Sequence, residues 1–192
     1  MKKEVRKNSK SSKVVSVIVM IICFAAVALA ILTRNTNTEV FTEEDPFEVI
    51  TNYDFDVKYP NGPYEVINAY NYTVQYLYGG EVAIDEIPHI VEQQRHLFST
   101  ELLNVNPYTD QVENLTAEIL TKQETEDFVL AIEQKIPQND GENPLYSYCD
   151  VTQYMKNGNN GYVRYTLVNE KNKWKIATWD PITKEEVKNE GL

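Results

Sequence analysis

The stretch YVRYTLVNEKNKWKIATWDP, residues 162–181, decides the fold class. On both sides of its short polar centre, EKNK, apolar and polar side chains alternate with a period of two, which is typical of β-strands. The stretch therefore predicts two antiparallel strands joined by a tight turn. In the second strand Trp174, Ile176 and Thr178 share one face, and the lysines share the other. If this alternation continues to the end of the strand, Asp180 has the same orientation as Trp174 and points toward the rim of the domain interior.

Two more strand-like stretches precede this hairpin. EDFVLAIEQKI, residues 126–136, alternates its apolar side chains, and LYSYCDVTQYM, residues 145–155, is rich in tyrosine. KNGNNG, residues 156–161, reads as a hairpin connection because Asn and Gly tolerate positive φ. The order predicts four strands in a meander.

Upstream of the strands, apolar residues recur with the period of a helix. They predict helices from Pro63 to the glycine pair at 79–80, at about 85–98 and at about 109–122. Between the last two, Ser99 or Thr100 is expected to cap a short helical turn. Three helices followed by four strands predict an α+β domain, with the helices packed on one face of an antiparallel sheet. We place this domain at residues 60–181.

A run of 19 uncharged residues, 14–32, lies near the N-terminus. A helix of that length spans roughly 28 Å, close to the ~30 Å hydrocarbon core of a bilayer. Residues 1–13 are basic, so the positive-inside rule places them in the cytosol and the α+β domain outside the cell. Residues 33–59 are expected to be an acidic tether, interrupted by Phe47, Val49, Ile50 and Tyr53, which are candidates to dock on the domain. Residues 182–192 are expected to be a C-terminal tail. The alternative is a signal peptide that is cleaved after Ala30.

The charge of the chain is unevenly divided. The first 34 residues carry a net +6, so residues 35–192 carry −17 of the total of −11. A domain this acidic repels phosphate backbones, which excludes nucleic acid as a partner. Cys149 is the only cysteine outside the predicted membrane segment, so the exported part cannot form an intramolecular disulfide. The expected partners are the membrane and either an envelope protein or a second copy of the chain.

Three stretches carry a resemblance to a known family: VEQQRHLFSTELL at 91–103, LTAEI at 115–119, and 162–181. With the anchor layout, they resemble a family of uncharacterised membrane-anchored proteins of Gram-positive anaerobes. Its members carry a nuclear transport factor 2-like (cystatin-like cone) domain after one membrane span. The resemblance implies a curved sheet under three helices, and it implies no activity. Some relatives of the broad fold, such as ketosteroid isomerase-like and polyketide cyclase-like enzymes, hold an Asp/His or Asp/Tyr site in the cone; others are binding or assembly modules.

An enzyme of the isomerase or cyclase type needs a buried carboxylate in the cone as its general base. Asp150 and Asp180 are the candidates, with Tyr165, Tyr148 or Tyr162 as the hydroxyl donor. Alternation does not assign Asp150 to either face of its strand. Asp180, which precedes a proline, equally fits the end of a strand.

One spacing suggests a metal site. His89, Glu92 and His96 form H-x-x-E-x-x-x-H on one helical face, a pattern that could hold zinc. That face lies opposite the apolar stripe of the same helix, so we expect a solvated surface and no metal. The sequence predicts no cofactor either, because it contains no glycine-rich loop that would cradle a phosphate.

Tyr72 and Tyr76 lie one turn apart, on the side of the first helix opposite its apolar stripe. They predict a surface for a partner, or a contact with another part of the same domain. The anchor, the acidic exported domain and the lack of a convergent catalytic set favour a non-catalytic binding or assembly module on the outer face of the membrane. The alternatives are an enzyme of the isomerase or cyclase type, and a ligand sensor that acts through a partner protein.

Overall fold

A computed structural model describes residues 45–189. The predicted cytosolic tail (1–13), the predicted membrane segment (14–32) and the start of the predicted tether lie outside the described residues. Among the helices that are described, none combines the length and the apolar composition needed to cross a bilayer. The membrane anchor therefore stays a prediction.

The described chain is α+β, with five helices first, then the strands, and one short helix at the end. Its elements are α2 (Pro46–Thr51), α3 (Pro63–Tyr78), α4 (Ile87–Arg95), α5 (Thr100–Val105), α6 (Tyr108–Thr125), β1 (Val129–Gln134), β2 (Gln138–Asn139), β3 (Tyr146–Met155), β4 (Gly161–Glu170), β5 (Lys173–Pro181) and α7 (Lys184–Asn189). The three predicted helices are α3, α4 and α6. The predicted short turn is α5, where the Ser99 hydroxyl accepts a hydrogen bond from the Leu102 N–H. The four predicted strands are β1, β3, β4 and β5.

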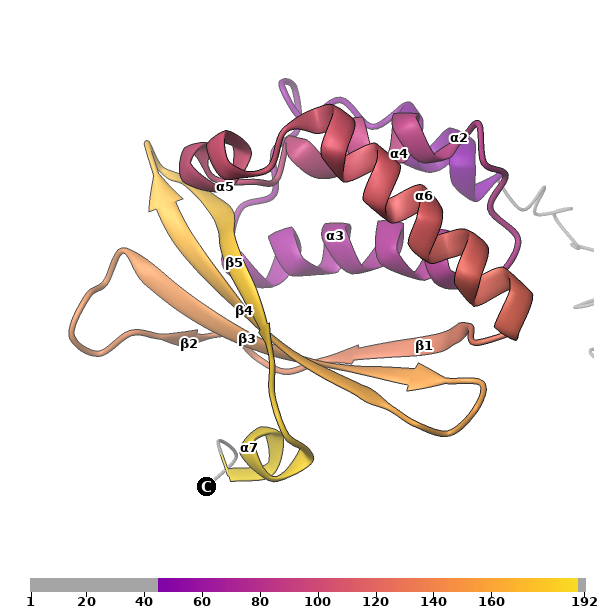
Figure 1. The fold of residues 1–192 in the computed structure, drawn as a ribbon. Coiled ribbons are helices and arrows are strands. Elements are labelled where there is room, and N and C mark those ends of the chain that lie inside the picture. Colours follow the sequence, from indigo (N-terminus) through magenta and orange to yellow (C-terminus); the bar gives the residue numbers. More distant parts are fainter. Residues whose placement is uncertain (1–44, 190–192) are drawn as a thin grey trace, which may run out of the picture. The chain divides into compact units, whose positions relative to one another are not determined.

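The sheet is antiparallel, with the order β1-β3-β4-β5, and the short β2 also pairs with β3. Helices α2 to α6 lie over one face of this sheet, and α7 lies on the other side (Figure 1). An antiparallel sheet covered by helices in this way fits a nuclear transport factor 2-like cone.

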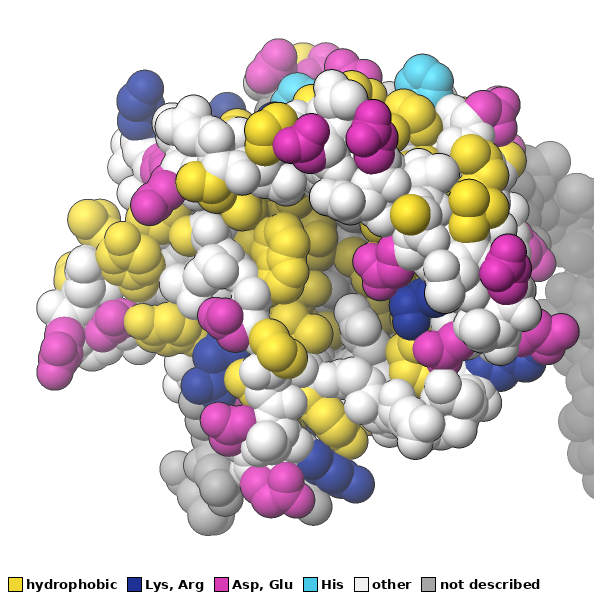
Figure 2. All heavy atoms as spheres, in the orientation of Figure 1, with side chains coloured by type: hydrophobic (Ala, Val, Ile, Leu, Met, Phe, Trp, Pro, Cys, Tyr) yellow, Lys and Arg dark blue, Asp and Glu magenta, His cyan; other side chains and the backbone are white. Residues whose placement is uncertain are grey.

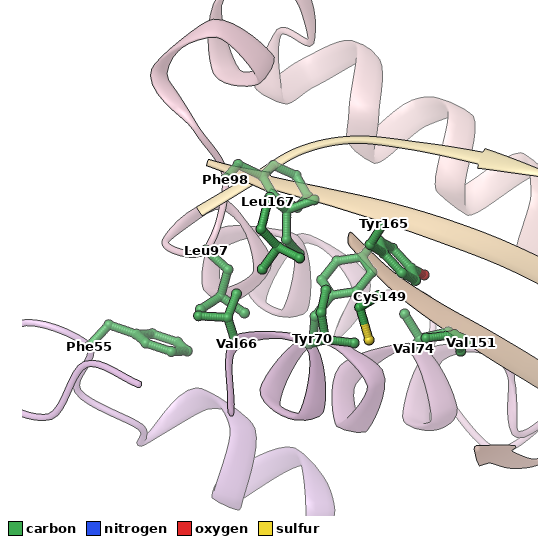
Figure 3. Packing of buried hydrophobic residues seen from close by; sticks show 12 residues of the cluster. Phe55, Val66, Tyr70, Val74, Leu97, Phe98, Cys149, Val151, Tyr165 and Leu167 are labelled. Carbon is green, nitrogen blue, oxygen red and sulfur yellow. The ribbon is translucent and has the colours of Figure 1, made fainter. Parts of the chain in front are cut away.

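Helix α3 supplies the centre of the hydrophobic core. Pro63 stands in its first turn, where a missing backbone N–H costs no hydrogen bond. Its buried residues recur every three or four positions, and they face β3, β4 and β5. Figure 3 shows this packing, which includes Val66, Ile67, Tyr70 and Val74 from the helix and Cys149, Val151, Tyr165, Leu167 and Ile176 from the strands.

The folded unit begins earlier than the sequence predicted. Asp45 caps α2 by accepting a hydrogen bond from the Phe47 N–H at 3.0 Å. Ile50 and Phe55 are both buried, and the compact unit starts at Asp45. Residues 45–59 therefore belong to the domain and not to the tether, because their apolar side chains are needed to cover the helices. At the other end, α7 occupies part of the predicted tail.

A β-bulge in β5 overturns the predicted orientation of its last residues. The pairing with β4 passes over Ala177, which is left as an extra residue. Beyond such a residue the inward and outward faces exchange. Trp179, and not Thr178, therefore turns toward the helices, where it meets the aromatic rings of the core. Asp180 lies across from Arg164 on the outer face and not at the interior rim.

Backbone hydrogen bonds tie the segment after α4 to β5. The Ser99 N–H donates to the Ile176 carbonyl at 2.8 Å, and the Ile176 N–H donates to the Leu97 carbonyl at 2.8 Å. This short parallel bridge covers the outer edge of β5 along part of its length. It also fixes α4 and α5 over one end of the sheet.

Candidate functional site

A cavity of about 420 Å³ lies between α3, α6 and the helix-facing side of the sheet. Figure 2 looks into a recess between the helices and the sheet, with hydrophobic side chains on its floor. Its volume falls within the range of small-molecule sites, roughly 300–1,000 Å³. The polar and aromatic side chains of its lining include Tyr70, Tyr78, Gln94, Glu118, Tyr165 and Trp179.

Aromatic rings form one wall of the cavity. The rings of Tyr70 and Tyr165 meet edge to face with centroids 5.6 Å apart. The Trp179 ring lies 5.9 Å from that of Phe98. Trp179 remains 39% exposed, so a ligand can still reach its indole. Stacked and edge-on aromatic contacts of this kind suit a flat apolar ligand.

The interior polar groups of the cavity are neutral. Burial raises the pKa of the Tyr70 and Tyr165 hydroxyls, and the negative charge of Glu118 adds to the effect on Tyr70. Both hydroxyls therefore stay protonated at neutral pH. Gln94 is buried, and its Nε2 donates to Thr73 Oγ1 at 2.8 Å. The cavity thus combines apolar walls with a few uncharged hydrogen-bonding groups.

Charged groups lie at the mouth of the cavity. The Glu118 carboxylate is exposed and lies beside Tyr78, whose pKa is raised first by burial and then by the Glu118 charge. The Lys122 ammonium is 3.1 Å from the Asp127 carboxylate. Among the described residues that line the cavity, no carboxylate is buried.

The predicted catalytic residues are not brought together. Both neighbours of Asp150 in β3 face the core, so Asp150 lies on the outer face, away from the cavity. Its carboxylate binds the Arg164 guanidinium at 2.7 and 2.8 Å and is 2% exposed. Asp180 is exposed on the same face. Of the predicted catalytic set, only Tyr165 lines the cavity. Tyr148 and Tyr162 lie on the outer face of the sheet, as Asp150 and Asp180 do.

The two histidines make aromatic contacts. The His89 ring meets Phe47 edge to face at 6.1 Å, and the His96 ring stacks on Phe55 at 5.5 Å. Both histidines and Glu92 are exposed. Within residues 45–189, no group of three side chains is arranged to hold a metal ion.

The two tyrosines predicted as a partner surface differ in their surroundings. Tyr72 is 46% exposed. Tyr76 is half-buried, and its hydroxyl donates to Glu86 Oε2 at 2.8 Å. Tyr76 therefore contacts another part of its own domain, which was the alternative for both residues. A role of Tyr72 in binding a partner stays a prediction.

Sequence reasoning missed two residues of the cavity, Gln94 and Trp179. Gln94 occupies the buried stripe of α4, and a polar residue in such a stripe was a usable signal. Trp179 gave no such signal, because the bulge at Ala177 reverses its orientation.

No curated protein matches the chain. Among solved structures, a crystal structure from Campylobacter jejuni described as an NTF2-like transpeptidase matches with 17% identity and a TM-score of 0.38, over 58% of this chain and 96% of that chain. A likeness this weak supports no functional argument. A family model described as Domain of unknown function (DUF6715) matches residues 1–179. Because this match spans most of the chain, the protein belongs to the DUF6715 family.

Proposed function

We propose that this protein is a non-catalytic binding module, anchored by one membrane span and exposed on the outer face of the cell membrane. Its ligand would occupy the cavity between α3, α6 and the sheet. The observation that carries the proposal is the composition of this cavity: aromatic walls and neutral hydrogen-bonding groups inside, with charges at the mouth. Such a lining suits binding, whereas an enzyme of the isomerase or cyclase type needs a general base inside the cavity, where the buried tyrosine hydroxyls stay protonated.

The lining favours an uncharged, flat ligand of modest size. Trp179 offers a partly exposed indole face, and Tyr78 adds a second aromatic side chain. Burying a charge beside these rings without a partner would cost far more than burying a neutral group. A neutral heteroaromatic molecule, or an aromatic side chain of an envelope protein, meets these requirements.

A test of the proposal is to block the mouth of the cavity. Asn114 lies on α6, lines the cavity and is exposed, so Asn114→Trp adds bulk at the mouth without disturbing the core. Neutral heteroaromatic fragments would be screened against the full-length protein by saturation-transfer NMR. Fragments that bind the natural chain should lose their signal with Asn114→Trp. The matched control is Glu113→Trp, an exposed position outside the cavity lining, which should keep the signal.

The proposal fails if no fragment binds, or if the two tryptophan variants bind the fragments equally well. Circular dichroism of both variants would verify that each one is folded.

One observation favours an enzyme of the isomerase or cyclase type as a second candidate. Glu118 and Tyr78 place a carboxylate beside a phenol at the cavity mouth. The base would then be Glu118, and not Asp150 or Asp180. Glu118→Gln separates the two functions, because a binding module keeps its ligand affinity in this variant whereas an enzyme loses turnover.

A further inference from the structure

A second hollow, of about 770 Å³, lies on the other side of α3. Its walls are α3, residues 49–61 and the end of β1, and we call it the α3 groove. It shares no lining residue with the cavity between α3, α6 and the sheet. Tyr70 and Val74 of α3 line the cavity, whereas Asn68 and Tyr72 line the groove, because these pairs point to different sides of the helix.

Two buried oxygen atoms at this groove have no hydrogen-bond partner among the described residues. They are Asn71 Oδ1 and Gln93 Oε1, and both side chains line the groove. Asn71 is 6% exposed. A buried acceptor without a donor is uncommon in native proteins and costs stability. Both atoms therefore point to a ligand that donates hydrogen bonds.

The hydrogen-bond network fixes the free atom of Asn71 as an oxygen. Gln134 Nε2 donates to the Tyr64 carbonyl at 3.1 Å, so Gln134 must present its Oε1 to Asn71. Asn71 Nδ2 donates to that Oε1 at 3.1 Å. Rotating the Asn71 amide would set two oxygens against each other, so the remaining Asn71 atom is an acceptor.

The same reasoning holds for Gln93. Its Nε2 donates to the carbonyl of Thr51 at 3.0 Å, and a backbone carbonyl can only accept. Gln93 Oε1 is therefore the free end of the amide. Two side chains that line the groove, from different helices, thus each carry a buried acceptor without a donor.

The walls of the groove favour a positive charge on that donor. Tyr53, Tyr64 and Tyr72 contribute aromatic side chains to the lining, and such rings attract cations through their faces. Two carboxylates, Glu65 and Glu133, also line the groove, and Glu133 is already paired with the Lys135 ammonium at 2.9 Å. The lining contains one lysine, Lys58. The −17 charge of residues 35–192 adds a long-range attraction for cations.

We propose that the α3 groove binds a primary ammonium group on an aliphatic stem, such as a lysine side chain or a free alkylamine. The ammonium has three N–H donors and no acceptor, which matches the two acceptors without donors, Asn71 Oδ1 and Gln93 Oε1. Its stem packs along the tyrosines, and its charge faces the acidic rim. This site is separate from the proposed cavity for a neutral ligand, so the two can be tested independently.

The first test uses the natural full-length chain with matched small probes. Pentylamine is compared with 1-pentanol, which has the same stem but no charge, by saturation-transfer NMR titration. Nα-acetyl-lysine N-methylamide is compared with its Nε-acetylated form in the same way. We expect both amines to bind, their neutral counterparts to bind at least about tenfold more weakly, and added salt to weaken amine binding. Tighter binding of the lysine derivative points to a peptide ligand, and tighter binding of pentylamine to a free amine.

The second test removes one acceptor. Gln93→Leu should weaken pentylamine binding at least about tenfold, because a hydrogen bond to a charged donor is lost. Gln123→Leu is the matched control. Gln123 also donates to a backbone carbonyl, that of Val82 at 3.1 Å, but it lies outside the groove. The control should bind pentylamine as the natural chain does.

The inference is overturned if 1-pentanol binds as tightly as pentylamine, if neither amine binds, or if folded Gln93→Leu keeps full affinity. The probe comparison on the natural chain stands even if a variant does not fold. Asn114→Trp at the cavity mouth should leave amine binding unchanged, so failure at one site is distinguished from failure at the other.

Discussion

At the scale of single residues, Asp150 is a buried charged side chain, and its stability depends on the ion pair with Arg164. The Asp150 carboxylate is 2% exposed and has both oxygens on the guanidinium. Arg164→Ala would leave this charge buried without its partner, so we expect a loss of about 3–5 kcal/mol in the free energy of unfolding. Urea denaturation followed by circular dichroism would measure it.

The control is the exposed pair Lys135 and Glu133, whose side chains are 51% and 48% exposed. Lys135→Ala should cost at most about 1 kcal/mol. Equal losses of unfolding free energy in the two variants would show that burial does not determine how much the Asp150–Arg164 pair stabilises the domain.

At Gly80, which follows α3, both the backbone conformation and the space available require a glycine. Its φ is +99°, and a Cβ atom there would come within 2.8 Å of the Phe128 ring. Gly80→Ala therefore combines backbone strain with a steric clash, and should cost about 1–3 kcal/mol in the free energy of unfolding. Gly141→Ala, where no heavy atom lies within 4 Å, should not destabilise in the same urea experiment. An unchanged urea midpoint for Gly80→Ala would contradict the packing described here.

Buried acidic groups make stability fall at alkaline pH. Burial, with a smaller contribution from Asp150, raises the pKa of the Cys149 thiol to about 12, whereas an unfolded thiol titrates near pH 8.5. Between these values the unfolded chain loses a proton that the folded chain keeps. The contribution is therefore complete below about pH 8.5 and is lost as the pH rises toward 12. The raised pKa values of Tyr70 and Tyr165 act in the same direction.

Urea denaturation at several pH values from 8 to 11 would measure this dependence. Cys149→Ala should remove part of the slope of unfolding free energy against pH, and the tyrosines should keep the rest. An identical slope in the variant and the natural chain would rule out the thiol as a contributor.

At the scale of elements, α2 is expected to stabilise the domain although it has only six residues. Ile50 is 4% exposed and packs in a cluster with residues of α3, α4 and α6. Ile50→Ala should lower the unfolding free energy by about 2–4 kcal/mol. Val57→Ala, at a position that is 84% exposed, should change it by less than about 0.5 kcal/mol. Comparable urea midpoints for the two variants would place residues 45–59 back in the tether.

Much of this architecture follows from periodicity in the sequence. The apolar stripes from Pro63 onward predicted α3, α4 and α6, and strict alternation predicted the strands, because in both cases one face is buried along the whole element. Two features broke the rule. α2 is too short to show a helical period inside an acidic segment, and one extra residue, Ala177, reverses everything after it in β5.

The candidate sites were harder to predict than the elements. Alternation alone could not show that Asp150 faces Arg164 on the outer side of the sheet, since both faces of β3 carry polar residues. The free oxygens of Asn71 and Gln93 depend on bonds to residues far away in the sequence, Gln134 and Thr51. A single sequence contains no sign of such long-range bonds.

At the scale of the whole molecule, the proposed anchoring has a direct test. The full-length protein expressed in cells should stay in the membrane pellet after an alkaline carbonate wash, because a spanning helix is not released by charge repulsion. Protease added to spheroplasts should digest residues 45–189, since we place the domain outside. Release of the protein into the supernatant, with a new N-terminus after Ala30, would instead support a cleaved signal peptide.

The position of β5 after the other strands and after helices α2 to α6 has a consequence for biosynthesis. Tyr59 donates to the Trp174 carbonyl at 2.7 Å, and the segment around Ser99 pairs with Ile176. A chain that leaves the ribosome N-terminus first completes helices α2 to α6 before this strand exists. Their apolar faces stay open until translation is nearly finished, and exposed apolar surface of this kind is prone to aggregation. Products of premature termination before residue 173 would lack the strand that closes the fold.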